Sequence, residues 1–187
     1  MASWCWTVPA LSALVLAGCS DKPPLPVYGM VSDFTLTDQN GAAFSNSALD
    51  KRVWVADFIY TNCPGPCPRM SSQMHQVQTA LAGGDGIRFV SFTVDPSHDT
   101  PAVLTAYAKH FDADPAKWFF LTGDVGTVNH LSRDVFRLSS VDGTLEHSTR
   151  FVLVDRQSRI RGYYSSFDQD AVPNLIADAK RLLQGGS

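Results

Sequence analysis

Two cysteines, Cys63 and Cys67, stand four residues apart in the segment 62–68. An apolar, β-branched run precedes this segment and a helix-favouring run follows it, so we expect a loop between a buried strand and a helix. Pro68 suits the first helical position, which would place Cys67 at or near the N-cap, where free N–H groups lower the pKa of a thiol. A proline-rich loop is a better setting for reactive cysteines than for cysteines that only pack in a core. Thiol–disulfide exchange, peroxide reduction and metal binding remain as alternatives.

A histidine further along the chain favours metal binding. Redox motifs of the thioredoxin type have two residues between their cysteines, whereas this loop has three. Peroxiredoxins place a threonine three residues before the reactive cysteine, and that position is Tyr60 here. Where thioredoxins present a proline opposite the cysteines, the segment before Phe151 contains His147 instead. Two thiolates and one imidazole form a ligand set that suits copper, zinc or another thiophilic metal.

Two aspartates are candidates for a supporting role. Asp57 lies in an apolar strand six residues before Cys63, on the face that it shares with Val55 and Ile59. Desolvation should raise its pKa. It either exchanges protons with the thiols, as the aspartate at the same spacing in thioredoxins suggests, or serves as a hydrogen-bonded structural residue. Asp95 either lies near the metal site or a partner, or caps a loop before a helix.

Other histidines and methionines are weaker ligand candidates. His75 is expected on an exposed helix face, and His98 lies in the loop after the second buried strand. Met70 and Met74 are four apart on the helix after the cysteines. Their thioethers could bind Cu(I), but methionines at helical spacing more often pack in a core.

The elements that must position these residues alternate along the chain. Strands are expected at 33–37, 53–60, 87–94, 119–121, 151–155 and 160–164, and helices at 68–81, from 99 onward, at 125–136 and at 171–183. This order predicts an α/β fold with a central mixed β-sheet flanked by helices, which is compatible with a thioredoxin-like fold.

Composition limits the classes of function. A chain of 187 residues suits one domain, and its net charge is −3 with lysines and arginines scattered along the sequence. No stretch gathers basic residues, so we expect no binding of nucleic acid.

The N-terminal segment has the pattern of a targeting signal. Residues 8–17 form an apolar run that is too short to span a bilayer, and Cys19 follows it in the sequence Leu-Ala-Gly-Cys. This pattern looks like a bacterial lipoprotein box, although the basic start of a usual signal is missing; a short buried helix is the alternative. We therefore expect a signal peptide at 1–18, a lipidated Cys19 with a tether at 19–32, and the folded domain at 33–184. The protein would then be a membrane-anchored lipoprotein outside the cytoplasm, on the periplasmic side.

The chain resembles the Sco/SenC family of copper chaperones over about residues 33–184. The resemblance lies in four segments: Tyr60–Pro68, Phe92–Pro101, Leu121–Gly123, and His147 before Phe151–Asp155. It implies that one copper ion binds to Cys63, Cys67 and His147. Asn62 departs from the pattern, because many members have histidine there, and Asp57 departs from it in a strand position that is often aromatic or apolar.

The resemblance also implies a role and a partner. The chain would deliver copper to the copper A site of cytochrome c oxidase subunit II, or act on another periplasmic copper or thiol protein. It would be primarily a metallochaperone, with thiol–disulfide oxidoreductase activity as a further capability. The alternatives are a periplasmic thiol–disulfide oxidoreductase that keeps partner cysteines reduced, and a copper sensor or buffer that transfers no metal.

Overall fold

The computed structural model describes Met1 and residues 23–138 and 148–185. Two residues with predicted roles, Cys19 and His147, lie outside these ranges. Within them, eight strands form one sheet in the order β1-β8-β7-β4-β5-β6-β2-β3. The elements are β1 (Gly29–Met30), β2 (Thr35–Asp38), β3 (Ala43–Ser45), β4 (Val53–Ile59), α1 (Pro66–Ala80), β5 (Ile87–Thr93), α2 (Pro101–His110), β6 (Trp118–Thr122), α3 (Val125–His130), β7 (Arg150–Val154), β8 (Arg159–Ser165) and α4 (Ala171–Leu183).

The sheet is mixed, and this confirms the predicted α/β fold class. Strand β4 pairs in parallel with β5, and β5 pairs in parallel with β6, while β7 joins β4 in the antiparallel direction. The two strands that the sequence did not predict are short edge strands: β1 pairs with β8, and β3 pairs with β2. Neither carries the length or alternation that marks a strand in sequence.

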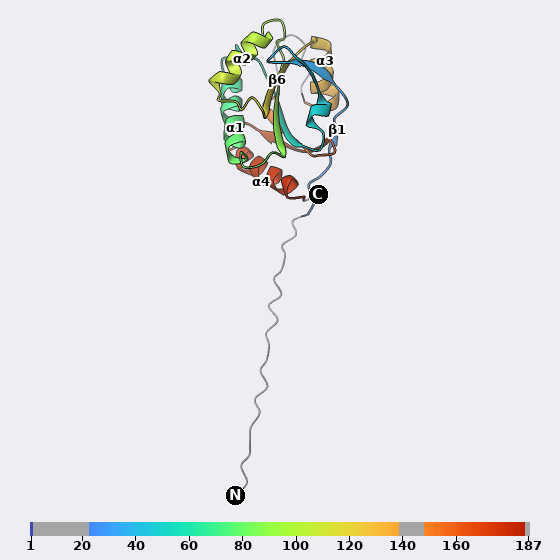
Figure 1. Ribbon diagram of the computed structural model, residues 1–187, viewed down its shortest axis with the longest axis vertical. Helices are drawn as coiled ribbons and strands as arrows, with labels where there is room; N and C mark the ends of the chain where they lie inside the picture. Colours follow the sequence, from blue (N-terminus) through green and yellow to red (C-terminus); the bar gives the residue numbers. More distant parts are fainter. Residues whose placement is uncertain (2–22, 139–147, 186–187) are drawn as a thin grey trace.

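Helices cover both faces of the sheet. Figure 1 shows α1, α2 and α4 along one side and α3 on the other. Every residue of β4 is buried, so this strand contributes to two cores. Its residues Val55 and Ile59 pack with α1, α2 and α4, whereas Trp54 and Phe58 pack with α3 and the turn after it. Asp57 therefore sits on the face that the sequence assigned to it.

The expected helix over 125–136 changes character along its length. Asp124 caps α3 by accepting a hydrogen bond from the N–H of Thr127, and α3 ends at His130. A π-helical turn continues from Leu131 to Val135. Among the described residues, no helix is long and apolar enough to cross a membrane.

The direction of the parallel strands gives the sheet two unlike ends. The carboxyl ends of β4, β5 and β6 meet at one end, which carries the loop with both cysteines and is called the cysteine end below. The start of β7 pairs with the close of β8 at this end, through Arg150 and Ser165. The starts of β4 and β5, the turn between β7 and β8, and the close of α4 lie at the opposite end.

Candidate metal centre

The cysteine loop connects β4 to α1 and is closed by its own hydrogen bonds. The N–H of Cys63 donates to the carbonyl of Tyr60 over 3.3 Å. The N–H of Tyr60 donates to the Sγ of Cys67 over 3.5 Å, and the N–H of Cys67 donates to the Sγ of Cys63 over 3.4 Å. Both cysteines are free thiols and both are buried. The loop therefore holds the two sulfurs beside each other.

The prediction for the start of the helix was wrong by two residues. Helix α1 begins at Pro66, with Gly65 as its N-cap, so Cys67 lies inside the first turn. Proline suits the first positions of a helix, and the sequence offers it at both 66 and 68. The Cys67 side chain consequently turns inward, where it is completely buried against the core beneath the loop.

The prediction of a lowered pKa for the Cys67 thiol was also wrong, and the hydrogen bonds of the loop lower the pKa of Cys63 instead. Burial alone would raise the pKa of the Cys63 thiol, but donors from Cys67, Gly65 and Tyr60 outweigh it and hold that pKa below its usual value. Burial raises the pKa of Cys67 far above its usual range, and the nearby charges of Cys63 and Asp57 add to this effect. A position in the first helical turn does not lower a thiol pKa when the side chain loses its contact with water.

Tyr60 joins the two thiols to the neighbouring loop. Burial raises the pKa of its hydroxyl, and so do the hydrogen bond to Cys63 and the charges of Cys63, Cys67 and Asp95. The hydroxyl therefore stays protonated and donates to the Cys63 sulfur. The sequence marked position 60 by its mismatch with peroxiredoxins and as part of the segment that resembles the Sco/SenC family, but not as a hydrogen-bond donor. Its role was missed, although an aromatic hydroxyl three residues before a cysteine could have suggested a donor.

Asp57 is completely buried beneath this loop. Its Oδ1 accepts a hydrogen bond from the hydroxyl of Ser91 over 2.6 Å, and Ser91 accepts one from the indole N–H of Trp118 over 3.0 Å. Its Oδ2 has no partner among the described residues. Burial raises the pKa of this carboxyl to about 7, despite the opposing bond from Ser91. The predicted direction of the shift is confirmed.

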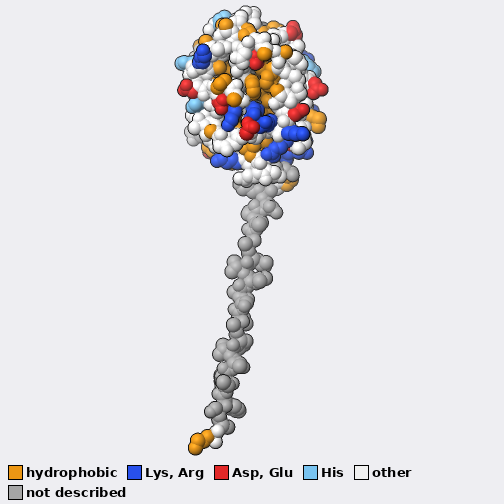
Figure 2. Space-filling model, viewed as in Figure 1, with side chains coloured by type: hydrophobic (Ala, Val, Ile, Leu, Met, Phe, Trp, Pro, Cys, Tyr) orange, Lys and Arg blue, Asp and Glu red, His pale blue; other side chains and the backbone are white. Residues whose placement is uncertain are grey.

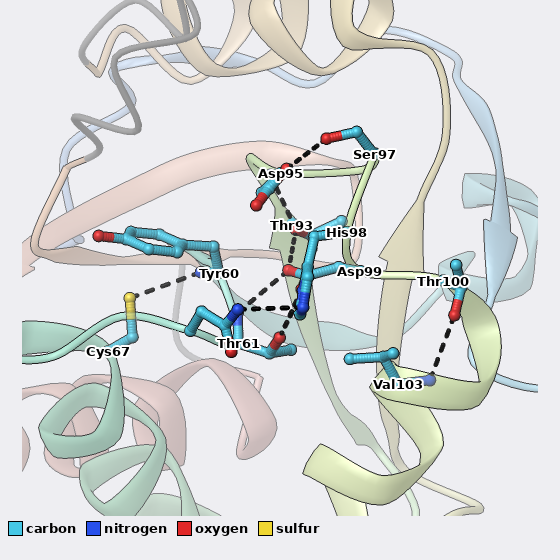
Figure 3. Close-up of polar contacts among 11 residues, drawn as sticks. Tyr60, Thr61, Cys67, Thr93, Asp95, Ser97, His98, Asp99, Thr100 and Val103 are labelled. Atoms are coloured by element: carbon cyan, nitrogen blue, oxygen red, sulfur yellow. Dashed lines mark hydrogen bonds and ion pairs between the residues drawn. The ribbon is translucent and has the colours of Figure 1, made fainter.

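Asp99, which the sequence analysis overlooked, fixes the loop that leads to the cysteines. Its carboxylate is fully buried and accepts hydrogen bonds from the N–H and hydroxyl of Thr61 and from the hydroxyl of Thr93. It also accepts a hydrogen bond from Nδ1 of His98 over 3.0 Å. Figure 3 shows these groups converging from the loops that follow β4 and β5. An acidic residue before a capping threonine could have indicated such a contact.

The other polar candidates take modest roles. His98 is exposed, and its Nε2 accepts a hydrogen bond from the side-chain amide of Asn62 over 3.0 Å, so it lies next to the cysteine loop. Asp95 accepts a hydrogen bond from Ser97 over 2.7 Å, which caps its loop, while its charge reaches Tyr60. His75 is half-buried on α1, contrary to the expected exposed position.

The methionines pack in the core, as the sequence favoured. Met70 and Met74 are completely buried in the cluster that contains both cysteines.

The structure thus brings together five of the candidate residues at the cysteine end: Cys63, Cys67, Asp57, Asp95 and His98. The described chain resumes at Ser148, two residues before β7 begins at this same end. Over the described ranges, no group of three potential ligands from histidine, cysteine, aspartate and glutamate is assembled. Two adjacent thiols, one with a lowered pKa, fit a soft metal ion that needs further ligands.

The hydrogen bond from Tyr60 gives a testable difference between the two thiols. In the reduced, metal-free protein, iodoacetamide should modify Cys63 before Cys67, because the thiolate is the nucleophile. Tyr60→Phe should raise the pKa of Cys63 and slow its alkylation near neutral pH. Peptide mass spectrometry over a pH series measures both rates.

The matched control is Tyr163→Phe, which also removes one hydroxyl, but one that donates to Phe136 on the other face of the sheet. Its alkylation profile should superimpose on that of the wild type. Faster modification of Cys67, or a Tyr60→Phe profile identical to the control, would show that the hydroxyl does not set the reactivity of Cys63.

Comparison with known proteins connects this geometry to a family. The family model SCO1/SenC matches residues 25–184. A SCO1/SenC family lipoprotein from Bacillus anthracis is 33% identical, with a TM-score of 0.76, over 83% of this chain and 95% of that one. BsSco, a Sco family protein of cytochrome c oxidase assembly with a disulfide switch, is 30% identical, with a TM-score of 0.75, over 87% and 97%.

A third solved structure contains a metal. ScoI from Bradyrhizobium japonicum, determined with copper bound, is 27% identical, with a TM-score of 0.67, over 82% of this chain and 99% of that one. The match with the family model spans most of the chain and includes the cysteine loop, the loop with Asp99 and the strand that follows residue 147. The chain belongs to the SCO1/SenC family and has its thioredoxin-like fold.

Proposed function

We propose that the chain binds one copper ion through Cys63, Cys67 and His147 and delivers it to the copper A site of cytochrome c oxidase during assembly. The observation that carries the proposal is the pair of adjacent, reduced thiols, of which Cys63 has a lowered pKa. Thiolate and imidazole are soft ligands that suit copper. The copper-bound relative from Bradyrhizobium japonicum supports this choice of metal.

The pKa values of the two thiols make copper binding compete with protons. Tyr60 and the backbone N–H of Cys67 stabilise negative charge on Cys63 before metal arrives. Cys67 keeps its proton until a cation replaces it, because its own pKa is raised. Copper binding therefore displaces protons, and the affinity should weaken as pH falls.

The test of the proposed ligand set is the loss of one ligand. The reduced protein should bind one copper ion, and His147→Ala should bind it at least about tenfold more weakly, since even residues behind a ligand typically contribute that much. Competition with a copper chelator measures the affinity. His110→Ala is the matched control, because it removes an exposed imidazole at the close of α2, away from the cysteine loop. Equal affinities for wild type and His147→Ala would rule out the three-ligand site.

A second function, reduction of a partner's disulfide, is favoured by the buried Asp57. When an external dithiol reduces the Cys63–Cys67 disulfide, the dithiol is oxidised to its own disulfide, the Cys63–Cys67 bond breaks, and the departing Cys67 sulfur takes up a proton because its pKa is raised. We propose that Asp57, whose pKa of about 7 keeps it partly protonated, exchanges that proton with Cys67. The disulfide switch of BsSco supports redox chemistry on this fold.

Asp57→Asn separates a proton-exchanging residue from a structural one. The variant should be reduced more slowly by dithiothreitol, with a flatter pH dependence, and should bind copper with unchanged stoichiometry. A raised carboxyl pKa destabilises the fold as pH rises, so the variant should gain stability over wild type by roughly 1.4 kcal/mol per pH unit between about pH 4 and about pH 7. Stopped-flow fluorescence and urea unfolding measure these changes.

The exposed Asp85 provides the control for this experiment, as Asp85→Asn removes a carboxylate far from the thiols. It should leave the reduction rate unchanged. If Asp57→Asn also matches the wild-type rate from about pH 5 to about pH 9, which spans carboxyl and thiol pKa values, Asp57 is purely structural.

We also propose that Cys19 carries lipid and holds the protein at the outer side of a membrane. The support is the sequence pattern before Cys19, and the relative from Bacillus anthracis is itself a lipoprotein. Intact mass spectrometry should show acyl chains on the mature protein, and Cys19→Ser should release it from the membrane fraction. A wild-type protein of unmodified mass in the soluble fraction would contradict the anchor.

A further inference from the structure

The chain enters the fold at the end opposite the cysteines, and two arginines hold it there. Arg161 is almost completely buried and donates to the carbonyls of Pro26, over 3.0 Å, and Leu25, over 2.6 Å. Arg181 donates to the carbonyl of Pro23 over 2.6 Å. The segment expected to be a tether is therefore attached to the domain from Pro23 onward.

Basic side chains gather around this attachment, although they are scattered in the sequence. Figure 2 shows several lysines and arginines gathered on the lower part of this face of the domain. The folded chain brings them here from the starts of β4 and β5, the β7–β8 turn and the close of α4. The set, called the basic end below, consists of Lys51, Arg52, Arg88, Arg156, Arg159, Arg161, Lys180 and Arg181. The acidic residues in the same segments are Asp50, Asp85, Asp155 and Asp178.

A polar cavity of about 250 Å³ opens in the basic end. Of the residues that the structure describes, three arginines line it, together with one carboxylate, that of Asp155. Arg159 and Arg161 both pair with this carboxylate, at 2.8 and 2.7 Å. Arg156 donates to the last carbonyls of α4 and, within residues 23–138 and 148–185, pairs with no carboxylate. The cavity keeps an excess of positive charge, which suits an anion.

The proposed anchor would bring the basic end to the membrane. Three residues lie between Cys19 and Pro23, so four Cα–Cα steps join them, and an extended chain of that length reaches at most about 14 Å. Charges in physiological salt act over about 8 Å. A domain held this closely by its basic end can bring the arginines within range of lipid headgroups.

We propose that the basic end is a membrane-docking surface that binds the phosphodiester headgroups of anionic phospholipids. The proposal rests on the proposed lipid anchor at Cys19, which selects a lipid headgroup as the occupant rather than a free anion. The cysteine end then faces away from the membrane, because the seven residues of β4 separate the two ends by roughly 20 Å. A partner would approach the thiols from the side away from the bilayer.

The experiment uses the chain from residue 19 with Cys19→Ser, which contains every described element of the fold and has no lipid. It should sediment with vesicles of phosphatidylcholine and phosphatidylglycerol, and not with phosphatidylcholine alone. The double variant Arg156→Gln, Arg159→Gln should bind at least about tenfold more weakly, since each basic residue near an anionic surface contributes severalfold. High salt should have the same effect.

The matched control removes the same charge from the cysteine end, through Arg137→Gln and Arg150→Gln, both of which are exposed. It should bind the anionic vesicles within about twofold of wild type. The exposed Lys180 gives a second variant, Lys180→Glu, that should weaken binding even if the arginine variant does not fold.

Three results would overturn the proposal: no binding by the wild type, binding that does not depend on phosphatidylglycerol, or equal loss in the control and the arginine variant. Copper binding by the same proteins is measured in parallel and should not change. The copper measurement therefore distinguishes a failure of the docking surface from a failure of the metal site. Because Cys19 is replaced in every protein tested, lipidation does not contribute to the binding that is measured.

Discussion

The hydrogen bonds to the buried carboxylate of Asp99 are the contact on which the rest of the site depends. They connect Thr61, in the loop after β4, to Thr93, the last residue of β5, and to His98 in the loop after β5. A carboxylate can be buried only if its charge is met by donors, and here three side chains and one backbone N–H meet it. Because Thr61 is held, the path of the chain into Cys63 is fixed before any ligand binds.

Competition for negative charge governs the chemistry that follows. Asp57, Cys63 and Cys67 can each become anionic in a small, dry space, and each disfavours the charge of the others. Hydrogen-bond donors surround the Cys63 sulfur and lower its pKa, so the first negative charge on a thiol forms there. Burial raises the pKa values of Asp57 and Cys67. A soft cation that enters this space relieves the repulsion, and oxidation to a disulfide relieves it as well. Metal uptake and thiol oxidation thus both remove the repulsion between the same anionic groups.

The sequence alone was sufficient for the fold class, the long elements and the burial of Asp57, because apolar runs and period-two spacing carry that information locally. Asp99 and Tyr60 were missed, since their importance arises from contacts between loops that the sheet brings together. The lowered pKa expected for Cys67 was wrong for a related reason: its place near a helix start suggested a stabilised thiolate, but its side chain turns inward, away from water.

The common direction of the parallel strands places the cysteine loop and the basic residues at opposite ends of the sheet. Carboxyl ends of β4 and β5 carry loops with thiols and acidic side chains, while the starts of the same strands lie beside arginines from β8 and α4. No local stretch of sequence shows this separation, because the basic residues come from several segments that only the fold brings together. Once the chain enters beside Arg161, the sheet itself acts as a spacer. The cysteine loop therefore lies at the end of the sheet away from the point where Arg161 holds the entering chain.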